Sequence, residues 1–291
     1  MILKNYLKLI RVDNYIKNLL IFLPAFFQPK LLIDYHFDLI VLFCVFSISS
    51  SIGYVINDLV DSRSDKLHPQ KKSRPLASGA LSIFKAYIVL IFLFIFLICF
   101  TLILGIEKLK IIYFYLLLNF FYTFYFKNLA IFDVCILSIF YTLRIILGAT
   151  IIDTDFSLWL ISFSYLFFLN LSSIKRLSDI NQNFNPKKND KFLYKNYSLS
   201  DYKLLKFLIP IFLIFSLAIL FIYITYYNNL FINKSYGFIF LSIIFLWNLR
   251  IIKKTFNDEI HSDPITFILK DKYTYICSFI GVILFFIIYL I

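Results

Sequence analysis

Glycine, methionine, histidine and tryptophan are scarce in this chain of 291 residues, which contains six Gly, one Met, three His and two Trp. So few glycines argue against a transporter built from broken helices, and no paired repeat is visible. The four cysteines lie far apart in apolar stretches without the spacing of metal ligands, so we expect buried small hydrophobic residues there.

Hydrophobic residues make up 61% of the sequence and charged residues only 16%. Apolar stretches of 18 or more residues recur along the whole length, which indicates membrane-spanning helices. These stretches are not ten-residue segments in which apolar and polar residues alternate, so a membrane β-barrel is excluded. The sequence therefore predicts an all-α, polytopic membrane protein.

We expect about nine transmembrane helices around a central cavity that opens to the cytoplasmic side, all within a single domain of residues 1–291. The expected spans are 15–33, 38–60, 80–105, 110–127, 130–151, 156–175, 203–227, 231–252 and 271–291. The longer polar loops then cover about 61–79, 176–202 and 253–270.

The net charge of +12 has an uneven distribution along the chain. With the N-terminus in the cytoplasm, 24 of the 29 Lys and Arg residues lie in cytoplasmic segments, as the positive-inside rule requires. The basic composition is therefore explained by cytoplasmic loops and predicts no nucleic-acid partner. We expect an integral, multi-pass protein of the bacterial inner membrane, with any active site facing the cytoplasm.

A block of charged residues directly follows the apolar run 39–56, so we expect this block at a membrane surface. Asp58, Asp61 and Asp65 are spaced i, i+3 and i+7, which places them within roughly 60° of one face of a continuing helix. Near a helix C-terminus three such carboxylates repel one another unless a cation holds them. Mg²⁺ carrying a diphosphate is the expected cation.

Several basic residues are candidates for phosphate binding, and most have a second interpretation. Lys71 and Arg74 follow the acidic block closely and suit its phosphates. Arg144 lies near the middle of an expected span, where it is either a buried ion-pair partner or an anion ligand in a polar cavity. Lys175 and Arg176 end another span, where a basic flank with a local ion pair is equally consistent with the sequence.

The acidic block, Asn57 to Asp65, together with the arm Arg74 to Gly79, resembles the first aspartate-rich motif of the UbiA superfamily of intramembrane prenyltransferases. Most members carry a second aspartate-rich motif after the sixth span. This chain has Lys175 and Arg176 there, followed by further lysines in the segment 187–195. That basic replacement resembles the branch of polyprenyl-phosphate phosphoribosyltransferases.

The resemblance implies a donor, 5-phosphoribosyl 1-diphosphate, and an acceptor, a polyprenyl phosphate lipid. Asp58 and Asp61 would be catalytic and, with Asp65, would hold Mg²⁺, which neutralises the leaving diphosphate. The residues expected to bind the substrates are Lys17, Asn57, Lys71, Arg74, Tyr122, Arg144, Lys175 and Arg176.

Two other functions remain open at this point. One is a UbiA-type prenyltransferase that moves a polyprenyl chain from its diphosphate to an aromatic acceptor. The other is a transporter or membrane scaffold without catalysis. Loss of activity in Asp58→Ala or Asp61→Ala protein that still inserts normally into the membrane would distinguish a catalyst from a scaffold.

Overall fold

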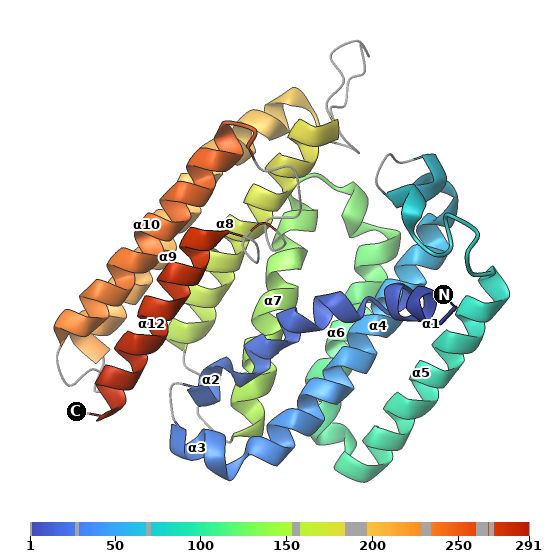
Figure 1. Ribbon diagram of the computed structural model, residues 1–291, viewed down its shortest axis with the longest axis horizontal. Helices are drawn as coiled ribbons and strands as arrows, with labels where there is room; N and C mark the ends of the chain where they lie inside the picture. The colour runs from blue at the N-terminus through green and yellow to red at the C-terminus, as the bar shows by residue number, and fades with distance from the viewer. Residues whose placement is uncertain are drawn as a thin grey trace. The chain divides into compact units, whose positions relative to one another are not determined.

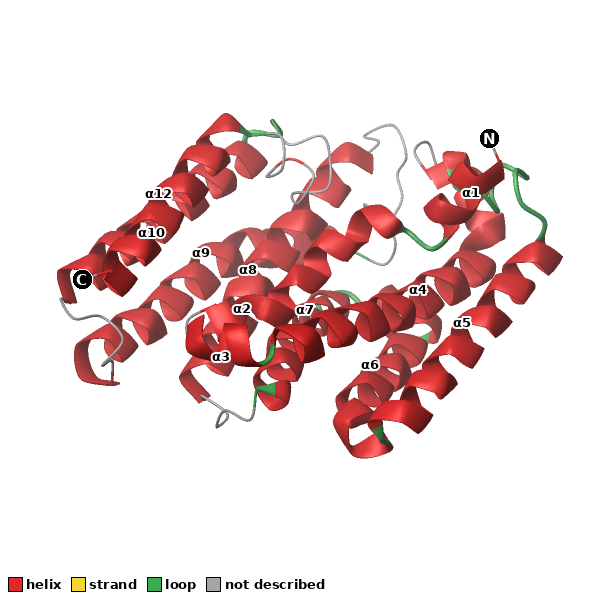
Figure 2. Cartoon of the chain, turned by 60° about the horizontal axis from the view of Figure 1, so that its bottom comes forward, coloured by secondary structure: helices red, strands yellow, loops and turns green. Residues whose placement is uncertain are grey.

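The computed structural model describes residues 2–26, 29–67, 71–152, 158–183, 197–227, 234–259, 267 and 271–290. Every regular element within these ranges is a helix, so the all-α prediction is confirmed (Figure 2). The elements are α1 (Ile2–Leu9), η1 (Val12–Phe22), α2 (Leu23–Phe26), α3 (Pro29–Asp34), α4 (His36–Leu67), η2 (Lys71–Ser73), α5 (Ile83–Leu104), α6 (Ile106–Phe124), η3 (Phe126–Asn128), α7 (Phe132–Ile151), α8 (Leu158–Asn183), α9 (Leu199–Ile222), η4 (Tyr223–Tyr227), α10 (Lys234–Phe256) and α12 (Lys272–Leu290).

The chain divides into two compact units. Unit 1 comprises Met1–Lys127 and Leu143–Phe156, and unit 2 comprises Asn128–Thr142 and Ser157–Ile291. Helix α7 therefore contributes its first half to unit 2 and its second half to unit 1. Within the described residues, six helices are long and apolar enough to cross a membrane, namely α4, α5, α7, α8, α10 and α9 with its extension through η4.

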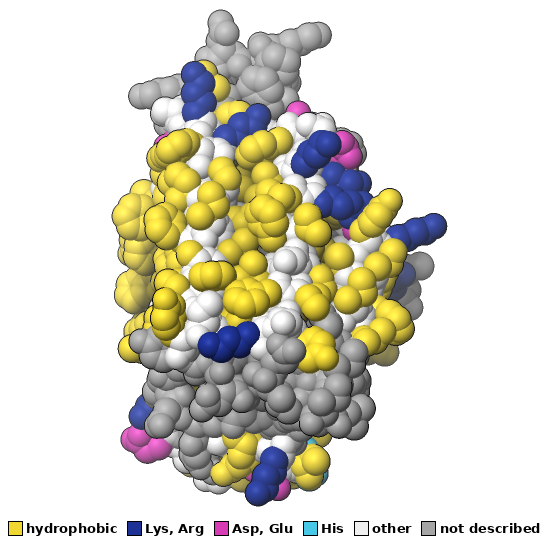
Figure 3. Space-filling view, turned by 90° about the vertical axis from the view of Figure 1, so that its left-hand side faces the viewer, with side chains coloured by type: hydrophobic (Ala, Val, Ile, Leu, Met, Phe, Trp, Pro, Cys, Tyr) yellow, Lys and Arg dark blue, Asp and Glu magenta, His cyan; other side chains and the backbone are white. Residues whose placement is uncertain are grey.

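The surfaces of these helices are apolar, as expected for lipid-facing segments. In Figure 3 hydrophobic side chains cover much of one face, and most Lys and Arg side chains on it lie toward the upper end of the view. Cys44 and Cys99 are exposed on such surfaces. The expectation that all cysteines are buried is therefore wrong, because an apolar helix that faces lipid needs no protein cover for a small hydrophobic residue.

The first expected span, 15–33, is not one continuous helix. Residues Val12–Phe22 form the 3₁₀ helix η1, and α2 and α3 follow as separate short helices. Prolines at 24 and 29 lack the backbone N–H that an uninterrupted helix requires. A 3₁₀ helix of eleven residues is unusually long, which indicates that tertiary contacts hold it.

One of those contacts is a close approach of η1 to α7 within unit 1. A Cβ added at Gly148 would overlap the backbone oxygen of Ile21. Only glycine permits this separation, because any side chain would overlap the carbonyl group. Gly148 thereby fixes η1 against the second half of α7.

Helix α4 is the central element of unit 1, where it packs against η1, α5 and α6 (Figure 1). Its 32 residues correspond to about 48 Å at 1.5 Å per residue. A bilayer core is only about 30 Å thick, so the polar last turns of α4 extend past the part that a membrane would cover. The expectation that this helix continues through the acidic block is confirmed.

A small hydrophobic cluster fixes the arm that follows α4. Leu76 and Leu81 of this arm are buried against Leu9 of α1 and Val55 of α4. Backbone hydrogen bonds from Ser78 N to Arg74 O (2.8 Å) and from Leu81 N to Pro75 O (3.0 Å) shape its turns. The main chain of Arg74 is thus held beside the C-terminal turns of α4.

Unit 2 is built on the pairing of α8 with α9, against which α10 packs. Buried side chains of these helices form one hydrophobic core with Val134 of α7 and with Tyr197. Helix α9 begins with a capping box, in which Ser198 and Asp201 bond each other's backbone N–H groups. Between α8 and α9, the Asn170 amide donates a hydrogen bond to Ile209 O at 2.7 Å.

Candidate functional site

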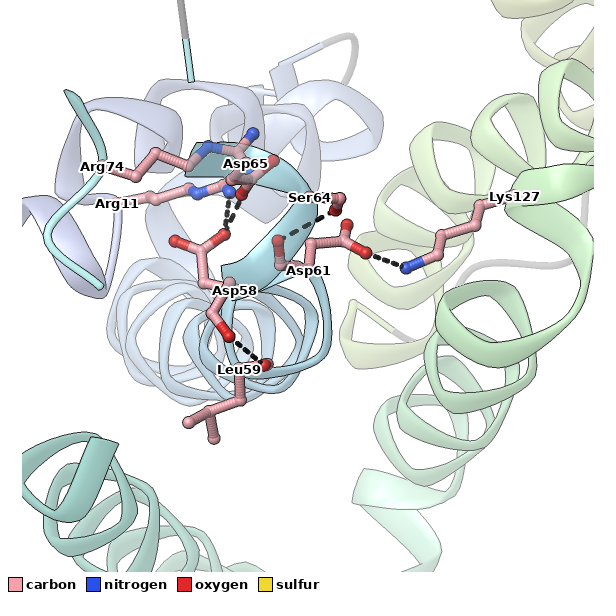
Figure 4. A network of polar contacts seen from close by, with 9 residues as sticks. Arg11, Asp58, Leu59, Asp61, Ser64, Asp65, Arg74 and Lys127 are labelled. Atoms are coloured by element: carbon pink, nitrogen blue, oxygen red, sulfur yellow. Dashed lines mark hydrogen bonds and ion pairs between the residues drawn. The ribbon is translucent and has the colours of Figure 1, made fainter. Parts of the chain in front are cut away.

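The acidic cluster lies on the last turns of α4, where the sequence places three carboxylates. Asp58 and Asp65 are buried and Asp61 is partly exposed. The structure brings basic side chains from three other segments to these acids, as Figure 4 shows. We refer to Asp58, Asp61 and Asp65 with their basic partners Arg11, Arg74 and Lys127 as the acid–base cluster.

Asp58 and Asp65 share a single cationic atom. Arg74 Nη1 lies 3.2 Å from Asp58 Oδ1 and 2.6 Å from Asp65 Oδ2. Arg11 also donates to Asp58 Oδ1 (Figure 4). The second oxygen of Asp58, Oδ2, is buried and has no hydrogen-bond partner among the described residues. A buried carboxylate oxygen left in this way can accept one further cation or donor.

Asp61 is directed to a different partner. Its Oδ1 lies 2.6 Å from Lys127 Nζ, just after α6 (Figure 4). The structure therefore pairs Asp58 with Asp65 through Arg74 and separates Asp61 from that pair. The i+3 spacing of Asp61 from Asp58 is consistent with a position on the flank of the same helical face.

Arg11 is a member of the cluster that sequence analysis did not select. Its backbone is left-handed, with φ 56° and ψ 52°, at the start of η1. A non-glycine residue there is uncommon, and its side-chain contacts offset the cost. These are the ion pair with Asp58 and a position of the guanidinium 4.8 Å above the Tyr54 ring centroid. In the sequence Arg11 was only one of several basic residues that flank the first span.

Arg144 forms a second buried polar group within unit 1. Its Nε donates to Asn18 Oδ1 at 2.9 Å, and the Asn18 amide donates to Ser47 Oγ at 3.0 Å. The guanidinium carbon lies 4.8 Å from the Phe46 ring centroid and 5.8 Å from that of Tyr115. Aromatic faces and an amide oxygen thus solvate this charge. The two interpretations offered from sequence, an ion pair or an anion ligand, stay predictions.

Unit 2 contains its own ionic group, formed by Asp133 of α7, Arg176 and Asp179 of α8, and Tyr197. Arg176 pairs with Asp133 and, at 3.1 Å, with Asp179, so the local ion pair expected from sequence is present. The Tyr197 hydroxyl donates to Asp133 and accepts from Ile131 N at 3.0 Å. Burial, together with the nearby Asp133 carboxylate, raises the pKa of Tyr197 above the ordinary tyrosine value.

The other predicted substrate-binding residues are all half-buried. Lys17, Asn57, Lys71 and Tyr122 belong to unit 1, whereas Lys175 belongs to unit 2 with Arg176. Their roles stay predictions. His68, which follows the acidic block, lies outside the described residues.

The carboxylates of the acid–base cluster meet part of what a divalent cation requires. Across the described ranges, no three acidic, His or Cys side chains are arranged as a ready metal site. Two oxygens, from Asp58 and Asp65, nevertheless converge on one positively charged atom, and Asp58 Oδ2 is buried beside them with no hydrogen bond from the part of the chain that the structure describes. Hard carboxylate oxygens are the ligands that Mg²⁺ takes. The pair therefore fits a divalent cation once Arg74 is displaced.

The helical fold and this cluster define an intramembrane helical protein with a group of paired acidic and basic side chains at the end of a long helix. The chain belongs to the UbiA prenyltransferase family, whose sequence model matches residues 19–191. With its apolar helices, this membership identifies an integral membrane protein.

Three relatives show how the similarity is distributed. Uncharacterized protein y4nM of Sinorhizobium fredii is 29% identical over 97% of this chain and 54% of its own length. Nodulation protein NoeC of Azorhizobium caulinodans is 30% identical over 68% and 64%. Decaprenyl-phosphate phosphoribosyltransferase of Corynebacterium glutamicum is 29% identical over 60% and 54%. The chain thus spans between about half and two thirds of the length of these relatives.

Among solved structures, a UbiA homolog from Archaeoglobus fulgidus bound to DMAPP and Mg²⁺ matches with a TM-score of 0.70. The match covers 98% of each chain at 14% sequence identity. At this identity the likeness establishes the fold and nothing about the substrates.

Proposed function

We propose that this protein transfers the 5-phosphoribosyl group from phosphoribosyl diphosphate to a polyprenyl phosphate lipid and releases diphosphate. The observation that carries this choice of donor is the basic segment that begins at Lys175 and continues with the lysines in 187–195, where a second aspartate-rich motif is usual in the family. A phosphorylated sugar donor and a phosphorylated lipid acceptor both need cationic partners. The similarity to decaprenyl-phosphate phosphoribosyltransferase supports the same choice.

The acid–base cluster supports a metal-dependent reaction. Asp58 and Asp65 would hold Mg²⁺, with Asp61 as a further ligand, on the donor diphosphate. When bound, the metal would neutralise charge that develops on the departing diphosphate. Arg74 and Arg11 lie within reach of the same carboxylates and would bind phosphate oxygens beside them.

The bonds exchanged in this reaction balance without a strong base. The bond from the anomeric carbon of the ribose to the diphosphate oxygen breaks, and both electrons leave with diphosphate. A lipid phosphate oxygen then forms the new bond to that carbon. This phosphate is ionised near neutral pH, so no proton has to be removed from the attacking oxygen. Arg144, Lys17 and Lys71 are proposed to bind the phosphates of the two substrates.

The test is to incubate purified protein with two alternative substrate pairs in the presence of Mg²⁺. Radiolabelled phosphoribosyl diphosphate with polyprenyl phosphate should yield a charged glycolipid, and addition of EDTA should stop its formation. Turnover only with a prenyl diphosphate and an aromatic acid would establish the alternative prenyl transfer instead. Undiminished product formation in EDTA would refute the metal requirement.

The orientation in the membrane is part of the same proposal. We propose a cytoplasmic N-terminus in the inner membrane of a bacterium, because phosphoribosyl diphosphate is a soluble cytoplasmic substrate and the basic loops favour that side. Protease digestion of inside-out and right-side-out vesicles measures this directly. Cleavage within 184–196 is expected only where the cytoplasmic face is accessible.

A further inference from the structure

Arg74 occupies the position between two carboxylates that a bound metal ion would be expected to take. One of its nitrogens contacts both Asp58 and Asp65. Arg11 adds a second positive charge at Asp58, so the two guanidinium groups balance the two carboxylates. Asp58, which lies at the centre of these contacts, is only 2% exposed and retains one buried oxygen that no described residue hydrogen-bonds.

We propose that Arg74, assisted by Arg11, is an internal counter-ion that blocks the metal-binding carboxylates until donor and metal arrive together. Metal binding then releases the Arg74 guanidinium to the donor diphosphate. This inference rests on the proposed function, because it assumes that the carboxylates of Asp58 and Asp65 hold a divalent cation. It assigns Arg74 a second position, on the substrate, that differs from the one observed.

Charge balance is the physical reason for the exchange. A divalent cation added to a neutral group of two acids and two guanidinium groups leaves two surplus positive charges in a largely buried site. Such a surplus is unfavourable, and the diphosphate anion compensates it. The metal alone should therefore bind weakly, whereas metal and diphosphate should bind cooperatively.

The surroundings of Arg74 permit its side chain to move while its backbone stays fixed. The arm is anchored by Leu76 and Leu81 in the hydrophobic cluster with α1. The Arg74 side chain is 23% exposed, in contrast to 2% for Asp58. The Arg74 side chain thus has access to solvent, and we expect rotation about its own bonds to release the carboxylates. No rearrangement of a helix is required.

The test measures Mn²⁺ binding to the purified full-length protein by the electron paramagnetic resonance signal of unbound Mn²⁺. Without diphosphate, Arg74→Gln should bind Mn²⁺ at least about tenfold more tightly than wild type, because one competing charge at contact distance has been removed. Arg74→Lys keeps that charge and should stay within about threefold of wild type. Arg250 of α10 pairs with Asp271 in unit 2, and Arg250→Gln is expected to leave Mn²⁺ affinity unchanged.

Inorganic diphosphate supplies the second arm of the experiment. It should tighten Mn²⁺ binding to wild type more than to Arg74→Gln, since the variant has no guanidinium to release. Equal or weaker Mn²⁺ affinity in Arg74→Gln would overturn the proposal, as would the absence of Mn²⁺ binding in every variant. If Arg74→Gln does not fold, Arg11→Gln must show the same direction with a smaller change, and no change would refute the inference.

The two proposals fail separately. If wild-type protein forms glycolipid but Arg74→Gln and Arg11→Gln bind Mn²⁺ with unchanged affinity, phosphoribosyl transfer is supported and the counter-ion role is refuted. If Arg74→Gln binds Mn²⁺ more tightly but wild-type protein forms no glycolipid, the counter-ion role is supported and the donor assignment is refuted.

Discussion

The two units each contain an ionic group, and the groups differ in how water reaches them. In the acid–base cluster of unit 1, the Arg11 and Arg74 side chains are 22% and 23% exposed. In unit 2, Asp133 is fully buried and the Arg176 side chain is only 4% exposed. The aromatic ring of Tyr197 covers that guanidinium at 5.6 Å.

This difference separates exchangeable contacts from fixed ones. A guanidinium that touches water can leave its carboxylate and be solvated, so its partner remains available to a ligand. A sealed pair has no such alternative, and removal of one member leaves the other charged and buried. We therefore interpret the group around Asp133 as structural and the group around Asp58 as functional, although each combines aspartates with arginine.

Asp133→Asn gives the largest expected change in stability. The substitution keeps the shape and the hydrogen bond to Tyr197 but leaves the Arg176 charge without its buried partner. We expect a loss of about 3 kcal/mol in the free energy of unfolding, measured on purified protein in detergent micelles. Asp179→Asn, whose carboxylate is 29% exposed, should cost below about 1 kcal/mol. Equal costs for the two variants would contradict the comparison.

Asp58→Asn should show the opposite pattern, with a large loss of activity and a small loss of stability. Glycolipid formation should fall by about two orders of magnitude or more, because a neutral amide neither binds Mg²⁺ well nor balances its charge. The stability should change by less than about 1 kcal/mol, since Arg74 retains Asp65 and reaches water. Full activity in this variant would show that Asp58 is not part of the catalytic site.

The sequence was sufficient for the helical class and for the course of most spans, because long apolar windows and a basic flank are local signals. It failed at residues 12–22. The choice between an α-helix and the 3₁₀ helix η1 depends on Gly148, which admits the Ile21 carbonyl, and on the bonds of Asn18 to Ser47 and Arg144. These partners are distant in the chain, so no local pattern reveals them.

The same distinction applies to the candidate site. The three aspartates share one helix, and Arg74 follows the last of them, Asp65, by nine residues, so sequence spacing predicted their proximity. Arg11 lies 47 residues from Asp58, and Lys127 lies 66 residues from Asp61. Their pairing results from the packing of η1 and α6 on α4. A single sequence contains no signal for such long-range ion pairs.

Tyr197→Phe should produce a medium effect within unit 2. The variant lacks the hydroxyl that bonds Asp133 and the Ile131 N–H, at an expected cost of about 1–3 kcal/mol, with glycolipid formation by the folded protein retained. Because the pKa of Tyr197 is raised in the folded protein, the unfolded chain loses this proton first as pH rises above 10. Wild-type stability should then decline, and this part of the decline should be missing in the variant. If the free energy of unfolding of wild type and variant declined identically above pH 10, the Tyr197 hydroxyl would make no pH-dependent contribution to stability.

Asp271→Asn is the smallest expected change and isolates one ion pair of unit 2. Arg250 donates to Asp271 at 2.9 Å, and this hydrogen bonding lowers the pKa of Asp271 below the ordinary value of 3.8. Asp271 also accepts from Thr274 N at 3.1 Å at the start of α12, and Asn serves that role as well as Asp.

The variant should therefore lose only the ion pair, roughly 0.5–1 kcal/mol at pH 7 by thermal unfolding in detergent. A depressed carboxyl pKa stabilises the fold above the unfolded value and ceases to do so as pH falls through the folded value. The difference between wild type and variant should consequently narrow below about pH 3.8. If the difference in stability between wild type and variant stayed constant between pH 7 and pH 3, Asp271 would act through the helix cap and packing alone. The partly exposed Arg11 and Arg74 of unit 1 would then be the better test of exchangeable charge.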